Sequence, residues 1–145
     1  IIGKVPYPFL HHFEGNQSYA YDPYRFTLMN TCQYAADRWL SLHLAWNGQG
    51  VLFNLIPGIR YLRLRELFTL KIAYGAYSDR HLSLATVNAA YLPKVSSLST
   101  PYVEIGCGIG NILRVLDIHS VWRLTHRDDP STPYWAMRFR LNLAL

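Results

Sequence analysis

The sequence predicts an all-β protein: an antiparallel meander of about six long strands that forms part of an outer-membrane β-barrel. Three observations support this. Aromatic residues make up 14% of the 145 residues and charged residues only 16%, a balance typical of strands and membrane interfaces rather than of soluble domains. Apolar and polar side chains alternate along several stretches, which is the period of a strand. Finally, no apolar run approaches the roughly 20 residues of a transmembrane helix.

The last strand has the clearest alternation. Its larger apolar residues occupy every second position, namely Trp135, Met137, Phe139, Leu141, Leu143 and Leu145. The intervening positions hold Ala136, Arg138, Arg140, Asn142 and Ala144. A tilted strand crosses the hydrocarbon with about 9 to 11 residues, and this stretch is long enough. In a membrane barrel the apolar set faces lipid and the other set faces a polar lumen.

Five further stretches show the same period upstream. Alternation is clear over 40–47 and 68–76 and weaker over 24–36, 102–109 and 118–126. Bacterial barrels alternate short inner turns with longer outer loops, so we expect inner connections at 48–62 and 110–116 and outer loops at 78–100 and 126–134. Since small closed barrels have about eight strands, residues 1–145 are expected to be the C-terminal part of a transmembrane barrel domain in a longer protein.

Charged residues fall on the face opposite the apolar one. Five of them are expected to project into the lumen from four consecutive strands, namely Lys71, Glu104, Arg123, Arg138 and Arg140. Opposite charges on adjacent strands can pair, so Glu104 is expected to pair with Lys71 or Arg123. The alternative is an anion-attracting pore constriction, because rings of Arg or Lys select anions. The structural network is the favoured interpretation.

Tryptophans near predicted strand ends indicate the membrane interface. Trp39 and Trp135 lie near outer ends and Trp46 near an inner end, as the aromatic girdles of a barrel require. In a soluble β-sandwich or a lipocalin-like binding module, which is the main alternative, the same residues would belong to the core.

The stretch Val103–Gly110, with sequence VEIGCGIG, matches the glycine-rich first motif of S-adenosylmethionine-dependent methyltransferases. Such a motif needs a parallel strand, a following helix and an acidic residue about 20 positions on. The downstream region predicts strands and has no such acid, so this alternative is the weaker one. We expect Gly106 and Gly108 to allow close packing in a strand.

No other pattern predicts a catalytic, metal or nucleic-acid site. Cys32 and Cys107 lack zinc-site spacing, and the six histidines are scattered. The net charge of +5 comes from dispersed Lys and Arg rather than from a basic run. We therefore expect no enzyme activity, no cofactor, no metal and no nucleic-acid partner.

Short stretches along nearly the whole chain carry a family resemblance. They are residues 3–8 (GKVPYP), 26–30 (FTLMN), 41–44 (SLHL), 54–57 (NLIP), 101–104 (PYVE) with Gly108 and Ile109, and 122–126 (WRLTH). In these the chain resembles the C-terminal barrel segment of a Bacteroidetes family of outer-membrane proteins that carry a carboxypeptidase-regulatory-like domain ahead of the barrel. The resemblance implies a bacterial outer-membrane location and no established enzyme activity.

The last strand also resembles the C-terminal signal by which BamA-type assembly machines recognise barrel clients. Its apolar residues at alternate positions carry the likeness, although such signals typically end in Phe and this chain ends in Leu145. The expected partners are therefore outer-membrane lipid, the BamA-type barrel assembly machinery and upstream strands of the same protein.

Overall fold

The computed structural model describes residues 10–76, 98–128 and 132–142 of the chain. Every regular element apart from two short 3-10 turns is a β-strand, and all strand pairs in the sheets are antiparallel. The strands are β1 (His11–His12), β2 (Ala35–Ala36), β3 (Arg38–Asn47), β4 (Arg65–Ala76), β5 (Leu98–Ile112), β6 (Leu116–Arg123) and β7 (Trp135–Leu141). The prediction of an all-β, antiparallel fold is confirmed.

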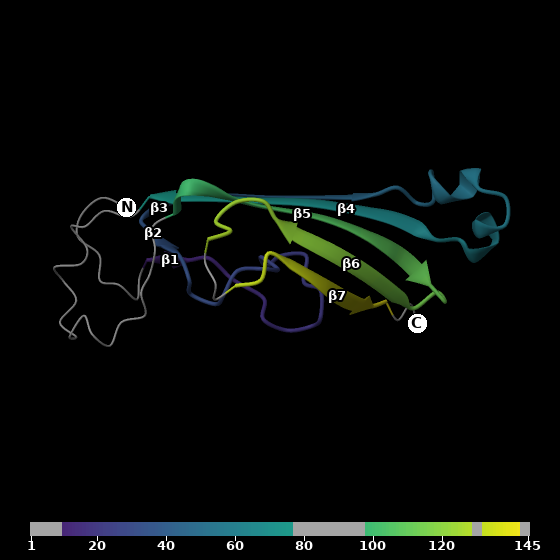
Figure 1. Cartoon of the computed structure of the whole chain (residues 1–145), viewed down its shortest axis with the longest axis horizontal. Helices are drawn as coiled ribbons and strands as arrows, with labels where there is room; N and C mark the ends of the chain where they lie inside the picture. Colours follow the sequence, from purple (N-terminus) through teal and green to yellow (C-terminus); the bar gives the residue numbers. More distant parts are fainter. Residues whose placement is uncertain (1–9, 77–97, 129–131, 143–145) are drawn as a thin grey trace.

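The five long strands form one sheet in chain order, β3-β4-β5-β6-β7. A meander of this kind follows from the sequence because each strand alternates in polarity and is followed by a turn or loop that returns the chain beside it. Figure 1 shows the sheet as a long curved layer, with the N-terminal part of the chain beside it. No helix among the described residues is long and apolar enough to cross a membrane.

The prediction of a long strand over 24–36 is wrong, so the sheet has five long strands rather than six. Only Ala35–Ala36 is extended there, and it pairs with β1 instead of the main sheet. The chain turns before it: the Gln33 amide donates to the Asn30 carbonyl at 3.2 Å, and Cys32 adopts a left-handed φ of 58°. Asn and its polar neighbours favour such turns over strands.

The remaining strands match their predictions in position and differ in length. β5 runs well beyond the expected 102–109, whereas β6 ends at Arg123, before the expected 126. β7 begins at Trp135 as predicted. Leu143 and Leu145 of the predicted assembly signal lie outside the described residues, as does most of the predicted outer loop 78–100.

The connection between β3 and β4 is organised by one carboxylate. It contains the short turns η2 (Phe53–Leu55) and η3 (Ile59–Leu62). The side chain of Glu66 accepts from the amides of Gly50 at 2.8 Å and of Leu52 and Phe53 at 2.6 Å each. Since these amides have no strand partner, the carboxylate satisfies them and fixes the connection at this end of the sheet.

Residues 10–37, here called the docked segment, pack against one face of the sheet. A compact apolar core joins this segment to β4 and β5, comprising Phe13, Phe26, Met29, Tyr34, Ala36, Ala73, Leu98 and Tyr102. The segment also pairs with the free edge of β7, where Phe139 accepts from the Tyr21 amide at 2.7 Å and donates to the Tyr19 carbonyl at 3.0 Å. Among the described residues, the sheet is therefore covered on one face and open on the other.

Candidate functional site

The uncovered face of the sheet, here called the apolar face, consists of aligned rows of apolar side chains. Strand register places Leu44, Leu70, Ile105, Trp122 and Trp135 in one row that crosses all five long strands. A second row contains Trp46, Phe68, Cys107, Ser120 and Met137. Because successive side chains of a strand point to opposite faces, the alternation seen in the sequence becomes one continuous surface.

This surface is exposed. Leu44 is 51% exposed, Phe139 43% and Leu141 70%. The other large apolar residues exposed on it are Leu40, Leu42, Trp46, Phe68, Tyr74, Ile105, Ile109, Trp122, Trp135 and Met137. Soluble monomers rarely expose a contiguous apolar patch of such extent, and one that does occur marks a membrane or protein interaction site.

One polar pair on the apolar face is closed within it. The indole Nε1 of Trp135 donates to Ser120 Oγ at 2.7 Å, and Ser120 is the polar member of the second row. A hydrogen bond closed inside the face removes the need for water at this point.

Of the three tryptophans assigned to the membrane interface, Trp46 and Trp135 lie on the apolar face. Trp39 is placed on the opposite face, where its ring stacks on His11 with centroids 3.8 Å apart and meets the edge of Phe13 at 6.5 Å. An odd-numbered residue of β3 points away from Leu40 and Leu42. The interfacial assignment therefore has no support from the position of Trp39.

The opposite face, here called the charged face, holds the residues predicted to face a lumen. Register aligns His43, Lys71, Glu104 and Arg123 directly across four strands. Lys71 is 3% exposed, Glu104 1% and Arg123 0%. Burial of charged groups at this level requires hydrogen-bond partners, and the docked segment supplies most of them.

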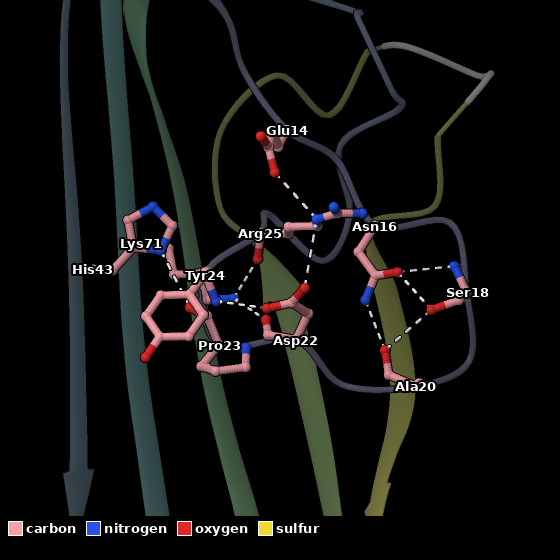
Figure 2. A network of polar contacts seen from close by, with 10 residues as sticks. All are labelled: Glu14, Asn16, Ser18, Ala20, Asp22, Pro23, Tyr24, Arg25, His43 and Lys71. Carbon is pink, nitrogen blue, oxygen red and sulfur yellow. Dashed lines mark hydrogen bonds and ion pairs between the residues drawn. The ribbon is translucent and has the colours of Figure 1, made fainter.

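Lys71 and His43 hold the backbone of the docked segment at residues 22–25. The Lys71 ammonium donates to the Asp22 carbonyl at 3.0 Å and to the Arg25 carbonyl. His43 Nδ1 lies 3.3 Å from the Pro23 carbonyl. Figure 2 shows both side chains reaching from the strands to this short stretch of backbone.

Glu104 holds the next residues of the same segment. Its carboxylate accepts from the Thr27 amide at 2.9 Å, the Leu28 amide at 2.7 Å and the Tyr102 hydroxyl at 2.6 Å. No ion pair joins Glu104 to Lys71 or Arg123 in the part of the chain that the structure describes. The expected direct pairing is replaced by charge-assisted bonds to backbone, with the neighbouring cations adding longer-range attraction.

The three arginines of the predicted network differ in their surroundings. Arg138 donates to the Thr27 carbonyl at 3.2 Å, so it also holds the docked segment. Arg123 donates to the hydroxyl and carbonyl of Thr132 and thereby anchors the loop before β7. Arg140 is exposed at the other end of the sheet. The register places all five residues on one face, while their lumenal position remains a prediction.

The docked segment is the feature that the sequence analysis missed. Its own turns are held by Asn16, whose amide donates to the Ala20 carbonyl at 2.6 Å and whose oxygen accepts from the Ser18 amide at 3.0 Å (Figure 2). A Cβ at Gly15 would lie 2.1 Å from the Met29 carbonyl oxygen, so only glycine fits there. The available signal was the turn-forming run Gly15–Ser18 followed by Asp22–Pro23.

Val103–Gly110 lies wholly within β5, between two antiparallel neighbours. A Cβ at Gly106 would lie 2.4 Å from Thr69 Oγ1, and one at Gly108 would lie 2.5 Å from the Ile118 carbonyl oxygen. These glycines allow close packing between strands, and none lies at a strand-to-helix turn. The motif therefore has no cofactor-binding geometry in the described residues.

The described side chains contain no group of three or more His, Cys, Asp or Glu that could hold a metal ion. The site that remains is the sheet itself, with an apolar face open to its surroundings and a charged face bound to the docked segment. Comparison of the chain with protein-family models, with curated proteins and with solved structures finds no match.

Proposed function

We propose that the chain forms one wall of an outer-membrane β-barrel, with the docked segment lodged against the lumenal side of that wall. The observation that carries this proposal is the reversed polarity of the sheet. Its apolar face is exposed, while Lys71, Glu104 and Arg123 on the other face are almost completely buried. A soluble sandwich would bury the apolar face of such a sheet between its layers, whereas here the docked segment and its small apolar core cover the charged face.

In this proposal, lipid covers the apolar face and removes its side chains from water. Each square ångström of apolar surface removed from water contributes about 25 cal/mol, so a face that spans five strands gains a large free energy on entering the hydrocarbon. β3, β4 and β5 contain 10, 12 and 15 residues, which meets the roughly 9 to 11 that a tilted strand needs. Upstream strands of the same protein complete the barrel by pairing the β3 edge and the part of the β7 edge that Tyr19 and Tyr21 leave free.

The docked segment gives this wall a lumenal occupant. Charged residues of three strands, Lys71, Glu104 and Arg138, hold its backbone. A segment held by buried charges on the wall narrows the lumen next to it. This supports a structural role for the charged residues over a selective pore, and we propose no catalytic role.

The apolar face can be tested by thiol labelling of the full-length protein in native membranes. Cys32 and Cys107 are first replaced by Ser, and single cysteines are then introduced as Leu44→Cys and Arg60→Cys. Leu44 lies on the apolar face, and Arg60 is exposed in the β3–β4 connection. A charged, lipid-insoluble maleimide is expected to label position 60 in permeabilised cells and to spare position 44 until urea and detergent are added.

Rapid labelling at position 44 in intact membranes, or recovery of the protein in the soluble fraction after an alkaline wash, would contradict the membrane proposal. Either result would favour the soluble sandwich or lipocalin-like module. Full protection of position 44 in a soluble, detergent-free preparation would instead indicate that another protein covers the apolar face, which also contradicts the proposal.

A further inference from the structure

We infer that a hollow at one end of the charged face binds a phosphate-bearing ligand. The hollow has a volume of about 430 Å³ and lies between β3–β7 and the docked segment. Three arginines line it, Arg65, Arg114 and Arg140, together with His119 and Asp117. This site goes beyond the proposed structural function, and its test does not depend on where the protein is located.

The positive charge of the hollow is not neutralised from within. No ion pair engages the guanidinium groups of Arg65, Arg114 or Arg140 in residues 10–76, 98–128 and 132–142. Asp117 is the acidic residue in the lining, and its two oxygens accept from the Asn111 amide at 2.9 Å and from the Asn142 side chain. The arginines therefore remain available for an external anion.

A buried histidine forms part of the wall of the hollow. His119 is 4% exposed, and its ring stacks on Tyr21 with centroids 3.7 Å apart. Its Nε2 is buried and has no hydrogen-bond partner among the described residues. Buried polar atoms without partners are uncommon in native proteins. This atom lies beneath the surface of the hollow, so His119 forms part of the wall and keeps Tyr21 in place, while the arginines supply the contacts to an anion.

The arginines are positioned by two connections that are tied together. The side-chain amide of Asn111, near the end of β5, donates to the Arg63 carbonyl of the β3–β4 connection at 2.7 Å. A second, more polar hollow of about 460 Å³ adjoins the first and shares Arg65 and Arg114 with it, adding Arg63. The cationic surface is thus continuous across both turns.

The chemistry of the lining favours phosphate over a simple halide or a single carboxylate. Guanidinium groups present parallel N–H donors that match phosphate and carboxylate oxygens alike, and the three arginines of the lining favour a ligand that carries more than one negative charge. A volume of about 430 Å³ falls within the ordinary range of small-molecule sites and exceeds the needs of one small ion. A phosphate ester or a diphosphate fits this description, and its source is either a soluble compound or a lipid headgroup.

The test uses full-length protein in neutral detergent, with pyrophosphate as the probe and sodium chloride at matched ionic strength as the reference. Thermal unfolding followed by tryptophan fluorescence is expected to show a concentration-dependent rise in Tm with pyrophosphate. The double variant Arg65→Gln/Arg114→Gln is expected to weaken the apparent affinity at least tenfold. Arg60→Gln, which removes an exposed arginine near the same end, is expected to leave it unchanged.

His119→Phe separates the wall of the hollow from its arginines, since it keeps a ring against Tyr21. We expect pyrophosphate binding within twofold of wild type for this variant, and a loss as large as that of the arginine double variant would contradict binding by the guanidinium groups. In nanodiscs, a response that persists in phosphatidylcholine and disappears in phosphatidylglycerol identifies the lipid headgroup as the ligand, while a response in both identifies a soluble phosphate. A wild-type protein without a response in detergent, or equal responses in wild type and the arginine double variant, would overturn the inference.

Discussion

The two faces of the sheet are made from the same strands but differ in polarity and in burial. On the apolar face, large side chains such as Leu44 and Phe139 remain exposed and form few contacts with the rest of the chain. On the charged face, Glu104 and Arg123 are buried, and their charged groups form hydrogen bonds to backbone or to hydroxyl groups. The apolar face offers no directional contacts, so it suits surroundings such as lipid that need none. The charged face offers hydrogen bonds that fit one particular segment, residues 10–37.

The largest expected effect is on the charged face. Glu104→Leu removes the acceptor for the Thr27 and Leu28 amides and leaves Lys71 without its neighbouring carboxylate, so we expect a loss of about 3–5 kcal/mol in the free energy of unfolding. Urea unfolding of the reconstituted full-length protein measures this loss. Limited proteolysis should cut within residues 10–37 of this variant first. The matched control is Glu14→Leu, which breaks a surface pair with Arg25 worth at most about 1 kcal/mol.

On the apolar face, the substitution expected to reduce folding most is one that introduces a charge, because the side chains there form few contacts that a truncation could remove. Ile105→Lys places an ammonium group in the middle of β5, and at the bilayer midplane it is expected to cost about 2–4 kcal/mol. The measurement is the yield of folded protein in the outer membrane, read from its heat-modifiable migration on gels. Tyr61→Lys, at an exposed position of the β3–β4 connection, serves as control. If Ile105→Lys behaves like an ordinary surface substitution, within about 0.5 kcal/mol, the face meets water.

A smaller effect is expected from the hydrogen bond inside the apolar face. Ser120→Ala leaves Trp135 Nε1–H without its acceptor, and hydrogen bonds of this kind in membranes contribute about 0.6 kcal/mol on average. A double-mutant cycle with Trp135→Phe isolates the pair, because Phe keeps an aromatic ring without a donor. A coupling energy of zero would show that water or lipid headgroups replace the missing partner.

The smallest effect concerns pH and the end of the docked segment. Burial, and after it the neighbouring His12, lower the pKa of His11, while Glu14 raises it. A lowered pKa means that the unfolded chain takes up a proton before the folded one does, so the stability from this site is complete above about pH 6.5 and decreases as the pH falls below it. His11→Phe keeps the stack on Trp39. The urea midpoint of wild type should fall more than that of His11→Phe between pH 7.5 and 5.5.

The strands could be predicted from the alternation of apolar and polar residues, whereas no such pattern predicts the position of the docked segment. Alternation over 135–141 reflects a local rule, namely that each residue of a strand faces opposite to its neighbours. The same rule, applied to Trp39 beside Leu40, already indicated the charged face for that residue. The bonds of Thr27 and Leu28 to Glu104 join positions more than 70 residues apart and involve backbone atoms, which have no sequence signature.

The hollow beside Arg65 and Arg114 also depends on contacts between distant parts of the sequence, so it could not be predicted from local patterns. Arg65 begins β4, and Arg114 lies in the β5–β6 turn with a left-handed φ of 67°. In the sequence these residues belong to two unrelated turns with scattered basic charge. Only the antiparallel register, which places Arg65 opposite Gly110, brings the two turns to the same end of the sheet.

The pairing of Phe139 with Tyr19 and Tyr21 has a consequence for biogenesis. An unpaired strand edge invites association with other chains, and β7 is an edge strand of the sheet. The stretch that covers this edge, Tyr19–Tyr21, precedes β7 in the sequence and is therefore synthesised before it. It can pair with the edge of β7 as soon as that strand forms. Deleting residues 10–21 would remove the stretch that covers β7, and the exposed strand edge would be prone to aggregation.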